Sequence, residues 1–201
     1  EYLPTSAIRS FIFARITLAE RLGPLAKLLP VPRLDSRRPL LRPAWALLSA
    51  VPGGKAIFSR LVGSMAPYTG TIRAHVIALR PGYAEVEMGD RRAVRNHLDS
   101  IHAIALVNLA EVAGNVALAY SLPDDARFIV SGLEIEYVKK ARGTITAIGE
   151  SPVPQTAARA AYDVPVTLRD ASGAEVARAV LHSLVGPKPG AAGAAPSEFA
   201  N

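Results

Sequence analysis

The chain has 201 residues, of which 50% are hydrophobic and 20% charged, with a formal net charge of +6 and no cysteine. The absence of cysteine excludes disulfides, thiolate metal sites and a cysteine nucleophile. No apolar run approaches the ~18 uninterrupted residues of a membrane span, which favours a soluble domain. A basic chain suits nucleic acid, anionic membranes or phosphorylated ligands. Its basic residues are scattered and only 6% of its residues are aromatic, so no nucleic-acid partner is expected.

Residues 1–66 are rich in Leu, Ala, Arg and Pro, which is typical of short helices separated by proline turns. Residues 6–22 place apolar side chains on one helical face and most arginines elsewhere. Residues 31–43 have the prolines and charges of a linker, and residues 53–67 predict a short helix that ends at Pro67. We predict a helical N-terminal extension, whose first helix docks on the domain, lies on an anionic membrane or covers an acyl tunnel.

From about residue 70 the apolar pattern changes to a period of two. Residues 71–90 alternate on either side of an RPG turn and predict a β-hairpin. A long helix follows over residues 99–121, and four further strands are predicted over residues 127–140, 143–150, 162–170 and 175–186. The tail, residues 188–201, is of low complexity and is predicted to be flexible.

This order of elements predicts an α+β fold in which one long helix lies on a single antiparallel sheet. The helix is apolar nearly all the way round, so both of its sides should be buried. One side can pack on the sheet, and a second copy of the chain is the economical cover for the other. We therefore expect a homodimer, or a tetramer that contains such dimers.

Four polar residues interrupt this apolar helix, and two of them carry chemistry that matters here: His102 near its start and Glu111 in its middle. At 100° and about 1.5 Å per residue, their spacing puts them on opposite sides of the axis and roughly 13 Å apart. They cannot share a site within one chain. In a two-fold dimer, His102 of one subunit could approach Glu111 of the other and form two equivalent composite sites.

The start of the helix offers a second element, because its first backbone N–H groups lack intrahelical partners and carry the positive end of the dipole. With Asp99 or Ser100 as the N-cap, the N–H groups near His102 and Ala103 stay free. Such donors can hold an oxyanion, and a carboxylate such as Glu111 can activate water or attack directly. These features predict hydrolysis of an activated acyl group without a serine, a cysteine or a metal.

At these residues the sequence resembles the hotdog-fold acyl-CoA thioesterases of the phenylacetate-degradation type. The resemblance rests on the element order, on the helix HAIALVNLAEVAG and on the spacing of Asn96, His102 and Glu111. The stretches MAPYTGTI, LRPGYAEVEM and RNHLDSIHAIALVNLAE are closer still to an uncharacterised branch of that superfamily. The resemblance covers about residues 65–187 and implies a hotdog domain, an antiparallel sheet wrapped around one helix, over residues 67–187.

The resemblance also implies roles for particular residues. The family's positioning asparagine falls on Asn96 and its helix-start histidine on His102. Its oxyanion donor becomes the N–H of Ala103, and its general base or nucleophile becomes Glu111. Two positions depart from the family pattern. The glycines that follow the family's histidine are Ala103 and Ile104 here, so Ile104 narrows the space beside the donor, and the family's acid is often an aspartate.

Further residues are candidate contacts to the substrate. Basic residues just before the helix and in a later hairpin turn would meet the phosphates of coenzyme A or of a carrier arm. Ser131 approximately matches an assisting serine or threonine of the family. The candidates are Ile104, Asn108, Ser131, Arg95, Lys139, Lys140 and Arg142. Structural alternatives stay open: the charges can form a solvated rim, Asn108 can bond across an interface, Asn96 can cap a turn and Glu111 can be a paired, buried carboxylate.

The expected function is hydrolysis of acyl thioesters, carried by coenzyme A or by an acyl carrier, at a dimer interface. No metal or other cofactor is expected, since the spacing of His97 and His102 matches no common zinc pattern. Two alternatives remain: a non-catalytic protein that binds fatty-acyl groups or lipids, and a purely structural dimer module without an acyl tunnel. The expected location is the cytoplasm, and the alternative in which the first helix lies on a membrane would place the protein at a membrane surface.

Overall fold

The computed structural model describes residues 40–189. The helix predicted over residues 6–22 lies outside the described residues, as do residues 190–201 of the predicted tail. Within the described range, short helices come first, then two strands, one long helix and four further strands.

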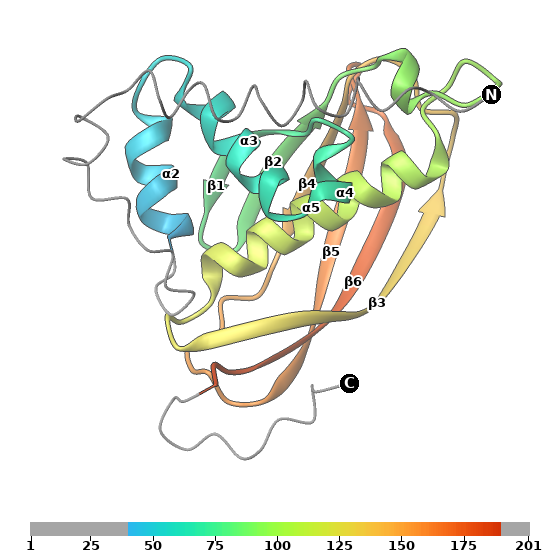
Figure 1. The fold of residues 1–201 in the computed structure, drawn as a ribbon. Coiled ribbons are helices and arrows are strands. Elements are labelled where there is room, and N and C mark those ends of the chain that lie inside the picture. Colours follow the sequence, from blue (N-terminus) through green and yellow to red (C-terminus); the bar gives the residue numbers. More distant parts are fainter. Residues whose placement is uncertain (1–39, 190–201) are drawn as a thin grey trace, which may run out of the picture. The chain divides into compact units, whose positions relative to one another are not determined.

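Six strands form one sheet, in the order β1-β2-β4-β5-β6-β3 (Figure 1). All neighbouring strands are antiparallel. Since β2 lies next to one edge of the sheet and β3 forms the opposite edge, the chain between them runs across the sheet from one edge region to the other. The strands are β1 (His75–Arg80), β2 (Tyr83–Met88), β3 (Ala126–Tyr137), β4 (Ile145–Glu150), β5 (Ala160–Asp170) and β6 (Glu175–Pro187).

Alternating side chains give the sheet one apolar face. In β2, Ala84, Val86 and Met88 are buried, while the residues between them are half-buried. Strand β5 repeats the pattern, with Val164 and Leu168 fully buried. The predicted hairpin is confirmed, as are the four strands predicted after the long helix.

The long helix, α5 (Ala103–Ser121), crosses the apolar face of the sheet (Figure 1). Two glycines permit its close approach: a Cβ on Gly149 of β4 would lie 2.6 Å from the carbonyl oxygen of Ala113, and one on Gly114 would lie 2.7 Å from the Leu181 side chain. By length and composition alone, α5 is long and apolar enough to cross a membrane. However, 61% of its most apolar window is buried inside this protein, as in the core helix of a globular domain.

Three helices precede the sheet: α2 (Leu41–Ser49), α3 (Gly54–Met65) and α4 (Pro67–Gly70). The rings of Trp45 and Phe58 pack edge to face, with centroids 5.0 Å apart, and join α2 to α3. The Nε of Arg42 donates to the carbonyl oxygen of Tyr120 at 2.7 Å and joins α2 to the end of α5. This contact places a cation at the negative end of the helix dipole.

Two sequence expectations for this region need adjustment. The predicted linker over residues 31–43 includes the start of α2 at Leu41. Pro43 is accommodated there because the first turn of a helix does not need its N–H. Pro67 ends α3 as predicted, but it also begins α4 as that helix's first residue.

Strand β3 is an edge of the sheet and, among the described strands, pairs with β6 alone. It has 12 residues, whereas the opposite edge, β1, has 6. Ile129, Tyr137 and the following Val138 are exposed along it. A long edge with exposed apolar side chains is a surface that another strand can extend.

Candidate functional site

Asn96 organises the loop that leads into α5. Its Oδ1 accepts hydrogen bonds from the N–H of Leu98 at 2.9 Å, and from the N–H and the hydroxyl of Ser100 at 3.3 and 3.1 Å. Between these residues, Asp99 has a φ of 51°, a left-handed conformation that aspartate tolerates better than most residues. The Asn96 oxygen is therefore occupied in the loop. Its amide nitrogen donates to no described residue, so this is the group that can orient a ligand.

His102 is the N-cap of α5, and its Nδ1 accepts a hydrogen bond from the N–H of Ile104 at 3.1 Å. The prediction that Asp99 or Ser100 caps the helix is therefore wrong, because those residues belong to the preceding turn and the helix begins at Ala103. Since Nδ1 is an acceptor, the neutral imidazole carries its proton on Nε2.

The first N–H of the helix, on Ala103, donates to no described residue. The next two N–H groups are used, by His102 Nδ1 and by the carbonyl oxygen of His102, which accepts from Ala105 at 2.9 Å. The phenol of Tyr137 donates to the carbonyl oxygen of Ala103 at 3.3 Å, so the end of β3 touches the helix start. Burial raises the pKa of Tyr137. Tyr137 is not among the predicted site residues, because no sequence pattern marks a tyrosine at the end of a strand.

Glu111 is half-buried in the middle of α5 and forms no hydrogen bond or ion pair with any described residue. Asn108 and Asn115 lie on the same helix face, and we call the three residues the mid-helix stripe. The Oδ1 atoms of both asparagines are buried and accept no hydrogen bond within the described part of the chain. The Nδ2 of Asn108 donates to the carbonyl oxygen of Tyr68 at 3.3 Å. The stripe therefore offers acceptors that lack donors.

The helix start and the mid-helix stripe are separate within one chain. Ala103 and Glu111 are eight residues apart on a regular helix, which corresponds to about 12 Å along its axis. A single thioester group cannot touch both. The arrangement supplies a free backbone donor for a developing oxyanion and, elsewhere on the same helix, a carboxylate that can take a proton.

Two of the predicted basic residues, Arg95 and Arg142, lie beside the loop that leads into α5. The N–H of Ile101 donates to the carbonyl oxygen of Ala141 at 2.8 Å and ties the loop before α5 to the turn after β3. The Nε of Arg142, in that turn, donates to the carbonyl oxygen of Asp99 at 3.3 Å. The structure thus places Arg142 beside the loop that leads into α5, and its contact with substrate phosphates stays a prediction.

The predicted basic residues besides Arg142 differ in whether they form ion pairs with neighbouring carboxylates. The Nε of Arg95 donates to Asp90 at 2.6 Å, and this bond holds the pKa of Asp90 below its ordinary value. Lys139 pairs with Asp170 at 2.7 Å and holds the pKa of that carboxyl far below its ordinary value. Lys140 is exposed and forms no hydrogen bond or ion pair with a described residue. All of these cations stay exposed, which suits contact with an anionic ligand.

Ser131 lies on β3, where the register with β6 shifts between Val130 and Gly132. Its hydroxyl donates to the carbonyl oxygen of His182 on β6 at 3.1 Å. This bond ties Ser131 to the neighbouring strand, and no hydrogen bond joins it to the other predicted site residues that the structure describes. Between residues 40 and 189, no group of three histidine, aspartate or glutamate side chains is arranged to hold a metal ion.

Comparison with known proteins identifies the domain. The family described as "Domain of unknown function (DUF4442)" matches residues 54–185. No curated protein matches the chain. Among solved structures, the crystal structure of a structural-genomics target is 33% identical over 74% of this chain and 99% of that one, with a TM-score of 0.65.

More distant structures show which fold this is. A protein of unknown function from Pseudomonas aeruginosa, described as a probable thioesterase, is 22% identical over 69% of this chain and 97% of that one, with a TM-score of 0.60. Zebrafish thioesterase superfamily member 2 is 18% identical over 65% and 94% of the two chains, with a TM-score of 0.55. These similarities confirm the predicted hotdog fold.

Proposed function

The chain belongs to the DUF4442 family and has the hotdog fold of the thioesterase superfamily, and we propose that it hydrolyses acyl thioesters of coenzyme A or of an acyl carrier. The observation that carries the proposal is Glu111, a half-buried carboxylate in the core helix without a partner among the described residues. A carboxylate with a purely structural role in such a place should be paired, because an unpaired buried charge costs free energy.

In the proposed reaction, Glu111 accepts a proton from water as the water oxygen attacks the thioester carbonyl carbon. The carbonyl oxygen becomes an oxyanion that the N–H of Ala103 stabilises. When the tetrahedral intermediate collapses, the C–S bond breaks and the leaving thiolate receives the proton from Glu111. The products are a free acid and a thiol. The amide nitrogen of Asn96 and the Nε2 of His102 orient the reacting groups.

We further propose that two copies of the chain form each site, with Glu111 from one protomer and Ala103 from the other. The separation of about 12 Å along one helix supports this, because it is too large for one thioester to bridge. The outer edge of β3, which pairs with no other described strand, supports it too, since pairing of two β3 edges would extend the sheet across a two-fold axis. Two such dimers can associate further into a tetramer.

The exposed cations beside the helix start are proposed to bind the phosphates of the carrier. Arg142 and Lys140 lie in the turn that bonds to the loop before α5, and the guanidinium of Arg95 is exposed beside them. Arginine and lysine side chains form charge-assisted hydrogen bonds to phosphate oxygens. Coenzyme A and acyl carriers both provide such phosphates.

One observation favours a second candidate function, the binding of acyl groups without turnover. Ile104 is 49% exposed beside the free N–H of Ala103. Its branched side chain has little rotational freedom in a helix and obstructs the approach of a carbonyl to the donor. A stable complex with an acyl-CoA that is not consumed would support this alternative.

The decisive experiment is thiol release from short-, medium- and long-chain acyl-CoAs by the wild type and by Glu111→Gln. Glutamine keeps the size of the side chain but cannot accept the proton, so we expect a loss of ~100-fold or more, as for removal of a general base. Glu87→Gln is the matched control, because Glu87 is half-buried on β2 and lies outside the site. Its activity should remain that of the wild type.

Two results would contradict the proposal. The first is an absence of thiol release across the whole panel from a protein shown to be folded and dimeric. The second is equal turnover by Glu111→Gln and the wild type. Retention of acyl-CoA without release would then assign the domain to the acyl-binding alternative.

A further inference from the structure

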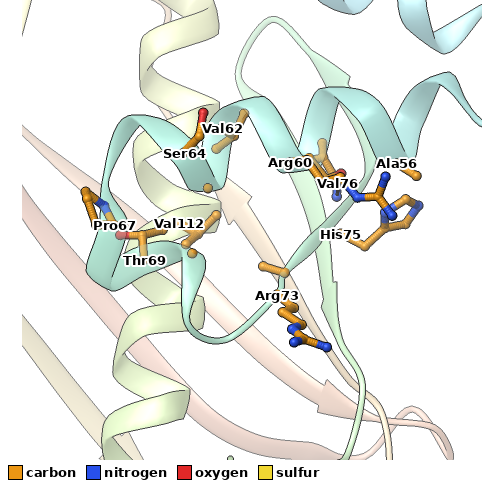
Figure 2. A pocket seen from close by; sticks show the side chains of 14 residues that line it. Ala56, Arg60, Val62, Ser64, Pro67, Thr69, Arg73, His75, Val76 and Val112 are labelled. Carbon is orange, nitrogen blue, oxygen red and sulfur yellow. Dashed lines mark hydrogen bonds between the residues drawn. The ribbon is translucent and has the colours of Figure 1, made fainter. Parts of the chain in front are cut away.

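A cavity of about 630 Å³ lies between α3, α4 and β1 (Figure 2). Its size falls within the range of roughly 300–1,000 Å³ that is usual for small-molecule sites. Val62, Val76 and Val112 supply apolar lining. A close backbone contact shapes the wall between α3 and α4, because a Cβ on Gly70 would lie 2.7 Å from the carbonyl oxygen of Gly63.

The ionisable residues that line this cavity are all basic. Arg60, Arg73 and His75 line it, and the described lining residues include no aspartate or glutamate. None of these three side chains forms a hydrogen bond or ion pair with a described residue. In Figure 2, Arg60 and His75 lie on one side of the cavity together with Val76, Arg73 lies below them, and Pro67 and Val112 lie on the other side. The cavity therefore has both basic and apolar side chains in its wall.

The backbone holds Arg73 in a particular conformation. Its φ is 53°, in the left-handed region that residues with a side chain rarely adopt. The N–H of Arg73 donates to the carbonyl oxygen of Gly70 at 3.2 Å, which fixes the turn from α4 into β1. This turn places Arg73 in the lining of the cavity.

We propose that this cavity binds an amphipathic anion, with its head group held by Arg60 and Arg73 and its apolar body packed against the valines. Guanidinium groups recognise carboxylates and phosphates through paired, charge-assisted hydrogen bonds. Two arginines line the cavity without an ion pair to any described residue, and no described lining residue is a carboxylate. Such a cavity favours a negatively charged ligand. The apolar lining adds affinity for a hydrocarbon body because it removes apolar surface from water.

This site is distinct from the one proposed for thioester hydrolysis. Val112 is the residue that α5 contributes to the described lining, and neither Glu111 nor Ala103 is part of it. The inference therefore does not depend on catalysis. Its test measures binding rather than thiol release, so the two proposals can fail independently.

The test is calorimetric titration of the full chain with octanoate, octyl phosphate and neutral octanol. We expect at least one of the two anions to bind about tenfold or more tightly than octanol. In the double variant Arg60→Gln/Arg73→Gln, the affinity for that anion should fall by about tenfold or more, which is the scale of lost hydrogen bonds to a charged group. The matched control is Arg80→Gln, which removes an exposed charge from the other end of β1, where Arg80 covers the Tyr83 ring at 3.7 Å. It should leave the affinity unchanged.

The anion that binds more tightly identifies the head group as a carboxylate or a phosphate. The single variant Arg60→Gln guards against misfolding, because Arg60 is exposed on α3 and should still weaken binding severalfold. The proposal is overturned if octanol binds as well as both anions, if the double variant binds like the wild type, or if neither anion binds at millimolar concentration.

Discussion

Two of the predicted catalytic residues also hold the backbone in place. The oxygen of Asn96 accepts three hydrogen bonds within its own loop, and the Nδ1 of His102 caps α5. Both sets of bonds position the N–H of Ala103. A loss of activity on replacing either side chain would therefore not, by itself, establish a role in the chemistry.

Two substitutions separate the structural role of His102 from a chemical one. His102→Ala removes the cap and should lower the free energy of unfolding by about 1 kcal/mol, whereas His102→Asn supplies another cap acceptor and should restore most of it. Denaturant unfolding measures this difference. If Nε2 also contacts the substrate, thioester hydrolysis stays low in His102→Asn although its stability has returned. Equal stability of His102→Ala and the wild type would contradict the cap.

The polar residues in and just before α5 are easier to identify from the sequence than the bonds that they form. Asn96, His102 and Glu111 stand out because polar side chains are rare in so apolar a stretch. The prediction of the N-cap is wrong because aspartate and serine are the preferred caps. In the structure, Asp99 and Ser100 instead belong to a turn that the side chain of Asn96 holds. The contact from Tyr137 depends on the packing of β3, which no local pattern predicts.

At the scale of the elements, periodicity predicted most of the fold. The alternation in β2 and β5 and the apolar helix α5 follow directly from burial on one face or on nearly all sides. The start of α2 lies in a segment of prolines and arginines that is typical of a linker. No local pattern predicts this start, because tertiary contacts stabilise the helix. Trp45 packs on Phe58, and Arg42 bonds to the end of α5.

The contact between α5 and the sheet depends on a glycine. In Gly149→Ala, the new Cβ would meet the Ala113 carbonyl oxygen at 2.6 Å. Backbone on both sides leaves no flexible side chain to yield, so we expect destabilisation by about 1–3 kcal/mol. Gly89→Ala is the matched control, because a Cβ there has no neighbour within 4 Å. Thermal unfolding of both variants checks the prediction, and equal melting temperatures would contradict it.

At the scale of the whole molecule, the proposed site differs according to whether one chain or two chains build it. Helix α5 is covered by the sheet on one side, and its mid-helix stripe has acceptors without donors. The edge of β3 remains unpaired among the described strands. Both features follow if a second copy of the chain completes the structure, and a functional test can distinguish that arrangement from a site within one chain.

Ala103→Pro provides one half of such a test, because proline lacks the N–H that is proposed to hold the oxyanion. Proline is favoured at the first position of a helix, and the φ of −64° and ψ of 138° at His102 suit a residue before proline. We therefore expect the fold to be kept and turnover to fall by about 100- to 1,000-fold, as for loss of one oxyanion donor. Unchanged turnover would contradict the role of Ala103.

Mixing Ala103→Pro with Glu111→Gln provides the other half. After the two variants are unfolded and refolded together in equal amounts, half of the dimers should contain one chain of each kind. In each mixed dimer, one composite site combines an intact Glu111 with an intact Ala103, so the mixture should recover about a quarter of the wild-type activity. If each site lies within one chain, every site carries a defect and the mixture stays as inactive as its components. Isolation of the mixed dimer with two different tags excludes failed exchange as the reason for a negative result.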